Sequence, residues 1–162
     1  MSPTGHFAIA FASKKYAGKL NIFILLCASF FIDIVYFISD VLGGEIKEVL
    51  SYSHSFLAAI VFSVIVYGIA RIFVGHKMGY VLALVVFSHW VLDFLVWDNL
   101  SWFPRSAQNI GLGFYTWLEI DTTNPQLNGQ TLFVTMLELT LLAIGVRMYI
   151  KARRESKTYS TT

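Results

Sequence analysis

The chain has 162 residues, of which 56% are hydrophobic and 14% are charged, and its mean hydropathy is +0.64. Soluble domains are less apolar and carry about 25% charged residues, so this composition excludes an ordinary soluble protein. The net charge of +2 gives no argument for nucleic-acid binding. The single cysteine, Cys27, excludes a disulfide within one chain.

The first predicted element is a short helix over Pro3–Lys15, apolar in its middle and ending in two lysines. It is too short to span a bilayer. It also lacks a small-residue cleavage site, and a signal peptide places its positive charges before the apolar stretch rather than after it. We therefore expect a half-membrane or interfacial helix, with Ser2 as N-cap and Pro3 at the first helical position.

Longer hydrophobic runs follow, each close to the roughly 20 residues that a helix needs to cross about 30 Å of hydrocarbon. They are Asn21–Leu42, Ser55–Val74, Gly79–Trp97 and Gln130–Ile150. The sequence thus predicts an all-α integral membrane bundle of four transmembrane helices plus the short N-terminal half-membrane helix, forming one domain over residues 1–151. Residues 152–162 are predicted to be a basic, Ser/Thr-rich cytoplasmic tail, disordered or lying against anionic lipid headgroups.

The distribution of basic residues predicts the orientation. With both termini in the cytoplasm, only Lys47 and Arg105 of the 12 lysines and arginines lie outside, which is a strong positive-inside asymmetry. All four tryptophans fall at or near the outer end, as in an aromatic belt. The outer segment 98–129 is long enough to be a functional lid. Its aromatic residues Trp102, Tyr115 and Trp117 would then cover a site beneath it.

Polar residues inside the hydrophobic runs indicate that site. An ionised side chain at bilayer depth costs several kcal/mol, so it is rarely there without a function. His89 and Asp93 are also four residues apart, which puts them on one helix face. At 1.5 Å of rise per residue, five polar side chains lie roughly 14–26 Å from the cytoplasmic side, where their helices can converge. These are His6, Asp33, His54, His89 and Asp93.

Three imidazoles and two carboxylates suit zinc, manganese or iron rather than calcium or magnesium. We therefore predict that these five residues bind a divalent metal, with zinc the first choice. Such a metal would offset the cost of burying two carboxylates. With an open coordination position it would activate water for attack on an ester, and Asp33 or Asp93 would serve as the base.

Each residue also has a simpler interpretation. His89 and Asp93 are compatible with a hydrogen-bonded pair that ties helices together, and Asp33 with a proton-relay group. His54 lies among serines that resemble helix caps, and His6 is compatible with a purely interfacial position. For two further polar residues we expect no part in the site. Glu138 is expected to form a structural hydrogen bond to a neighbouring helix, and His76 to be solvated at the surface.

The same residues carry a resemblance. The segments Gly5–Ala12, Ser53–Leu57 and Ser88–Asp93 resemble the bacterial family of membrane-bound metal-dependent hydrolases, in order with Asp33, Gly111–Gly113 and Glu138. The HxxxD unit of His89 and Asp93 is similar to one in zinc-dependent phospholipases C. The resemblance implies a helical protein of the bacterial inner membrane, in contact with membrane lipids, that cleaves a phosphoester in a lipid with the help of a metal.

Two other classes of function remain open. One is a non-catalytic subunit or scaffold that binds membrane-protein partners in a larger assembly. The other is a small transporter or proton relay that uses the same acids. The second of these is less favoured, because the four runs show no inverted-repeat symmetry.

Overall fold

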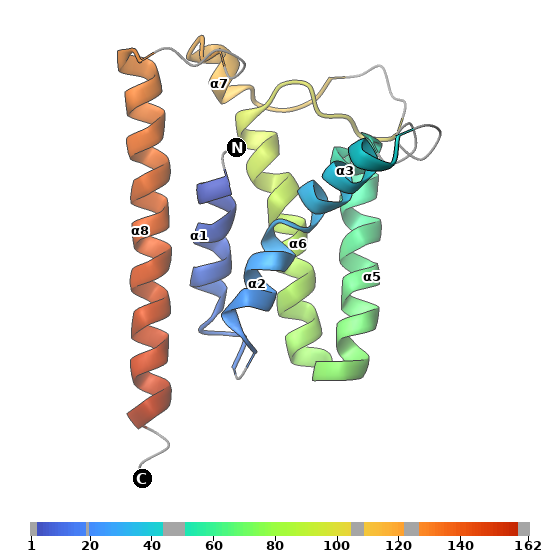
Figure 1. Cartoon of the computed structure of the whole chain (residues 1–162), viewed down its shortest axis with the longest axis vertical. Helices are drawn as coiled ribbons and strands as arrows, with labels where there is room; N and C mark the ends of the chain where they lie inside the picture. The colour runs from blue at the N-terminus through green and yellow to red at the C-terminus, as the bar shows by residue number, and fades with distance from the viewer. Residues whose placement is uncertain (1–2, 19, 44–50, 105–108, 122–126, 159–162) are drawn as a thin grey trace.

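The computed structural model describes residues 3–18, 20–43, 51–104, 109–121 and 127–158, which form helices and their connections. Within these ranges the only strand-like pairing is an isolated antiparallel bridge between Leu100 and Ile110. The elements are α1 (Pro3–Ser13), α2 (Ile22–Ser29), α3 (Phe31–Leu42), the 3₁₀ turn η1 (Ser51–His54), α5 (Phe56–Val74), α6 (His76–Val96), α7 (Phe114–Trp117) and α8 (Gly129–Thr158) (Figure 1).

Helices α5, α6 and the segment Gly129–Glu155 of α8 are each long and apolar enough to cross a membrane. Helices α2 and α3 meet the same criterion together, as a pair bent by 62°. The predicted all-α membrane bundle is therefore confirmed, with three spans, or four when the bent pair is counted as one.

The bent pair departs from the prediction, because Asn21–Leu42 is not one continuous helix. Phe30 ends α2 with φ −107° and ψ 9°. The Ser29 hydroxyl donates to the Leu26 carbonyl at 2.9 Å, a back-bond of the kind that bends helices. The Ser29 carbonyl accepts a hydrogen bond from another helix. The run holds neither proline nor glycine, so the usual sequence signals of a break are missing.

The central helix is α6. In its most apolar window 44% of the residues are buried, against 17% in α5 and in α8. Large apolar side chains on α5 are exposed instead, among them Val64 at 63%, Ile72 at 79% and Phe73 at 80%. Lipid tails can cover such side chains, whereas exposure of so large an apolar surface to water is unfavourable.

Helix α1 lies between α8 and the α2–α6 pair (Figure 1). Small residues allow this close approach. A Cβ atom added to Gly145 of α8 would lie 2.5 Å from the carbonyl oxygen of Ala8, and Ala10 is fully buried. The rings of Phe11 and Tyr149 continue the contact, 5.6 Å apart. The packing therefore holds α1 against α8 and the rest of the bundle.

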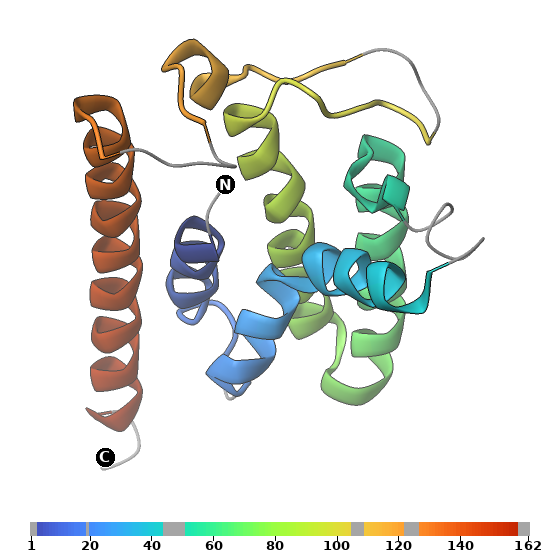
Figure 2. The ribbon, with the colours of Figure 1, turned by 45° about the horizontal axis from the view of Figure 1, so that its top comes forward.

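Helix α3 runs across the bundle from the end of α2 toward η1 and the start of α5 (Figure 2). This crossing brings α3 close to η1 at the start of α5. Ser55 caps α5 by accepting a hydrogen bond from the Ala58 amide at 3.3 Å. The serine at this position is thus a helix cap, as expected from the sequence.

The segment after α1, the α5–α6 turn and the C-terminal end of α8 gather at one end of the bundle (Figure 1). These segments carry most of the basic residues. The charge asymmetry of the sequence is therefore also an asymmetry between the two ends of the bundle. Which end faces the cytoplasm stays a prediction.

The part of the predicted tail before Tyr159 is helical, since α8 continues to Thr158. Ala152–Lys157 is rich in strong helix formers, which explains the extension.

Candidate metal centre

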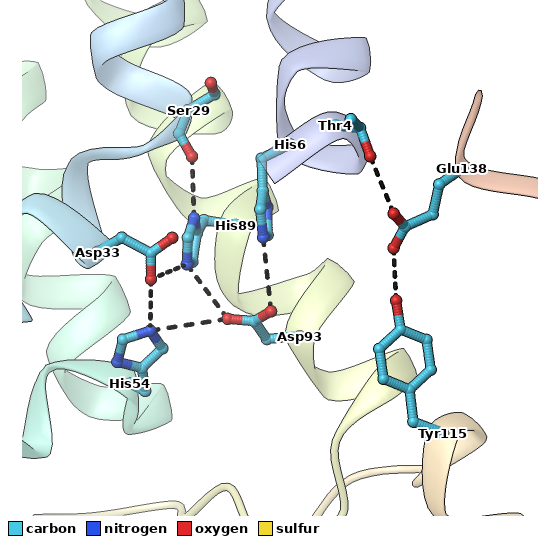
Figure 3. A network of polar contacts seen from close by, with 9 residues as sticks. All are labelled: Thr4, His6, Ser29, Asp33, His54, His89, Asp93, Tyr115 and Glu138. Carbon is cyan, nitrogen blue, oxygen red and sulfur yellow. Dashed lines mark hydrogen bonds and ion pairs between the residues drawn. The ribbon is translucent and has the colours of Figure 1, made fainter. Parts of the chain in front are cut away.

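The five predicted residues come together in the half of the bundle away from the basic end. They reach one point from four elements: His6 from α1, Asp33 from α3, His54 from η1, and His89 and Asp93 from α6 (Figure 3). We call this set the His/Asp cluster. The depths estimated from the sequence therefore correspond to a convergence of these side chains in space.

His89 and Asp93 form the buried floor of the cluster. They are 1% and 3% exposed, and His89 Nε2 lies 3.2 Å from Asp93 Oδ2. On the other side of the ring, His89 Nδ1 donates to the Ser29 carbonyl at 2.9 Å. The break between α2 and α3 thus supplies a backbone acceptor that holds the imidazole in place.

Asp33 and His54 form the more open side. Their side chains are 22% and 26% exposed, and His54 Nε2 lies 3.1 Å from Asp33 Oδ1. The other ring nitrogen of His54, Nδ1, lies 3.1 Å from the Ser53 hydroxyl. Asp33 Oδ1 is also 3.4 Å from His89 Nε2. Asp33 is therefore the link between the buried floor and the partly open side.

His6 closes the cluster from α1. Its ring stacks on the ring of His89, with centroids 3.9 Å apart and planes 10° apart. His6 Nε2 lies 3.5 Å from Asp93 Oδ1. The side chain is 1% exposed, so the short first helix contributes a buried polar group and is not merely interfacial.

The spacing of these atoms fits a metal. Two groups each place three ligand atoms within 4.8 Å of one another, and both groups contain His89. The groups are His6–Asp33–His89 and His54–His89–Asp93. A tetrahedral site with bonds of about 2.0–2.1 Å has ligand atoms about 3.4 Å apart. The nitrogen–oxygen separations in the cluster run from 3.1 to 3.8 Å, close to that value.

The surroundings of the two ring nitrogens of His89 also favour a cation at this position. Nδ1 faces a carbonyl, which only accepts, so Nδ1 carries a proton. In a neutral imidazole Nε2 is then a bare lone pair, and it faces two carboxylates that also only accept. Nε2 is buried and makes no hydrogen bond. Either a divalent cation or a second proton on the ring resolves this arrangement, and both would offset the two carboxylate charges.

Glu138 lies outside the His/Asp cluster. It is 6% exposed and accepts hydrogen bonds from Thr4 Oγ1 at 2.9 Å and from Tyr115 OH at 2.5 Å (Figure 3). It thus ties α8 to α1 and to α7, which is the structural hydrogen bonding expected from the sequence.

His76 is exposed, as expected, with Nδ1 2.8 Å from Tyr67 OH.

Of the three outer aromatic residues predicted to cover the site, Tyr115 is directed to Glu138, while the covering role of Trp102 and Trp117 stays a prediction. Tyr115 bonds to Glu138, Trp102 packs edge-on against Phe56 with centroids 5.3 Å apart, and Trp117 is 76% exposed. These contacts attach the described parts of the outer segment to α5 and α8.

Sequence reasoning missed two partners, the Ser29 carbonyl and Tyr115. A backbone carbonyl carries no residue-specific signal, and the break that frees it is not marked by proline or glycine. Tyr115 lies in α7, and Gly113 precedes that helix with a left-handed φ of +62°. A Cβ atom on Gly113 would lie 2.9 Å from the Cβ atom of Asp98. This glycine is therefore the residue in the sequence that could have indicated the close packing of this segment.

Comparisons with protein-family models, with curated proteins and with solved structures found no match for this chain. The resemblance to membrane-bound metal-dependent hydrolases therefore remains a prediction from the motifs.

Proposed function

We propose that the His/Asp cluster binds a divalent transition metal, zinc by preference, and hydrolyses a phosphoester in a lipid. The observation that carries the proposal is the arrangement of His89. Its Nδ1–H is fixed on the Ser29 carbonyl, and its buried Nε2 faces Asp33 and Asp93 without a hydrogen bond. Ligating histidines characteristically donate their other ring N–H in this way.

The residues divide into two roles by burial. His6, His89 and Asp93 are almost fully buried, which suits ligands that only hold a metal. A metal bound here would supply Lewis acidity and a nucleophilic water near neutral pH. Asp33 is the more exposed carboxylate of the two. It is therefore assigned as the proton acceptor, with His54 at 3.1 Å orienting it.

The open side of the cluster indicates how a substrate would approach. Asp33 and His54 are the partly exposed members, and Tyr36 stands edge-on to the His54 ring with centroids 5.6 Å apart. A headgroup linkage would enter between α3 and η1. The surrounding apolar surface of α3, including Phe37 at 56% exposure, suits a lipid better than a bulk solute.

The test is turnover of a panel of phospholipids and polyprenyl phosphates by detergent-purified full-length protein with zinc or manganese supplied. Asp93→Asn keeps the shape of the side chain and removes its charge, and Asp98→Asn is the matched control. Asp98 is exposed and bonds to Thr116 at 3.0 Å, away from the cluster. We expect Asp93→Asn to lower the rate on the preferred substrate at least 100-fold, and Asp98→Asn to leave it within about twofold.

Equal background rates from wild type, Asp93→Asn and Asp98→Asn on every substrate would end the enzyme proposal. Metal bound at the cluster without turnover would instead favour a non-catalytic subunit stabilised by a structural metal centre.

A further inference from the structure

A second polar feature lies at the opposite end of the bundle from the His/Asp cluster. A cavity of about 870 Å³ opens between the segment that follows α1 and the C-terminal part of α8. This volume is within the range of about 300–1,000 Å³ that is typical of small-molecule sites. The cavity belongs to neither the cluster nor the Glu138 contacts, because none of their residues lines it.

The charged lining of the cavity is mainly basic. It contains Lys14, Lys15 and Arg153, with Glu155 as the one carboxylate among the described residues that line it. Lys14 Nζ donates to the Gly18 carbonyl at 2.8 Å and to the Leu20 carbonyl, which fixes the ammonium group in the wall. Burial lowers the pKa of Lys14, because the ammonium has lost water without gaining an anion.

The remaining lining is partly apolar. Leu20 and Ile22 continue the cavity toward the membrane-spanning part of α2, and Tyr149 and Ala152 do so on α8. The α8 residues of the lining lie within Gly129–Glu155, the segment that contains the apolar window of this helix, and they stand at its charged end. The cavity therefore combines basic residues at the charged end of α8 with an apolar wall beside them, the arrangement expected where hydrocarbon gives way to headgroups.

We infer that this cavity binds the phosphate headgroup of an anionic phospholipid, with the acyl chains lying along the apolar wall. Basic pockets between membrane helices bind such headgroups because the phosphate meets several cations while the chains stay in hydrocarbon. A free phosphate ion would use the cations and leave the apolar wall without an occupant, so the lipid is the better match. The inference is independent of any metal at the His/Asp cluster.

The test is a lipid titration of the full-length protein in detergent, read by native mass spectrometry. Phosphatidylglycerol, phosphatidylcholine and inorganic phosphate are the probes. The double variant Lys15→Gln/Arg153→Gln removes two charges from the cavity and spares Lys14, which donates to backbone carbonyls. The matched control, Arg71→Gln/Lys77→Gln, removes two exposed charges from the end of α5 and the start of α6, at the same end of the bundle.

Phosphatidylglycerol should bind at least tenfold more tightly than phosphatidylcholine. The cavity variant should lose about fivefold in affinity per removed charge, and the control should stay within about twofold. Equal binding of the two lipids, or equal losses in the two variants, would overturn the inference. Binding of inorganic phosphate with the same sensitivity to the cavity variant, and without lipid selectivity, would replace the lipid by a free anion.

Discussion

His89 Nδ1 donates to the backbone carbonyl of Ser29 at 2.9 Å, at the point where α2 ends and α3 begins. One interaction thereby links the central helix of the bundle to the break in the first span. It orients the imidazole, and it satisfies a carbonyl that an uninterrupted helix would have used itself. The break is thus part of how the His/Asp cluster is built.

Helix α8 should position His6 through its close contact with α1. In Gly145→Ala the new Cβ atom meets the Ala8 carbonyl at 2.5 Å, so α1 must shift. We expect a loss of about 1–3 kcal/mol of stability from overpacking and a metal affinity at least tenfold weaker, because His6 moves with α1. Thermal unfolding and Co²⁺ titration would measure the two effects.

Gly68→Ala is the control for this substitution, since nothing lies within 4 Å of its Cβ position on α5. The control should keep wild-type metal affinity and gain slightly in stability, because alanine is the better helix former. If Gly145→Ala bound Co²⁺ as tightly as Gly68→Ala, the positioning of His6 by α8 would be wrong.

The Tyr115 hydroxyl should stabilise the fold through Glu138. Tyr115→Phe removes a hydrogen bond to a buried carboxylate, a change that costs about 1–3 kcal/mol. Thr135→Val on α8 is the control, because its hydroxyl is exposed and bonds only within its own helix in the described contacts, to the Thr131 carbonyl at 2.8 Å. Thermal unfolding in the same detergent should separate the two variants, and equal melting temperatures would contradict the assigned role.

The charge asymmetry predicts that both termini are cytoplasmic. A cysteine introduced at Ser160, in a chain whose Cys27 is replaced by alanine, should react with a membrane-impermeant maleimide only after the cytoplasmic side is exposed. Labelling of intact cells from outside would invert the topology. The His/Asp cluster would then lie nearer the inner leaflet.

Much of the cluster was predictable because its signals are local. The four-residue spacing of His89 and Asp93 defines a helix face, and the distance of each polar residue from the basic end gives its depth. The convergence of Asp33 and His54 follows from those depths. The 62° bend between α2 and α3 did not follow, because neither proline nor glycine marks it and the donor to the Ser29 carbonyl lies 60 residues away in sequence.

The outer segment shows the other limit of sequence reasoning. Its tryptophans and Tyr115 were predicted to cover the site, since aromatic residues in a long loop suit a lid. In the structure Tyr115 turns to Glu138 instead. The Glu138 carboxyl group offers a buried hydrogen-bond acceptor, which is a stronger partner for a hydroxyl group than an aromatic contact. Which partner the Tyr115 hydroxyl finds depends on which groups lie near it in three dimensions, and the composition of the segment does not show this.

The most direct test of the central claim is the metal content of the protein, purified without chelator and measured by inductively coupled plasma mass spectrometry. A metal bound at the His/Asp cluster should give about one transition metal per chain in wild type and in His76→Ala. We expect less than about a tenth of that in His89→Ala, which removes the ligand common to both three-residue groups. Folded wild-type protein without metal, unable to take up added zinc, would rule out a metal centre here and leave His89 as a protonated ring held between Asp33 and Asp93.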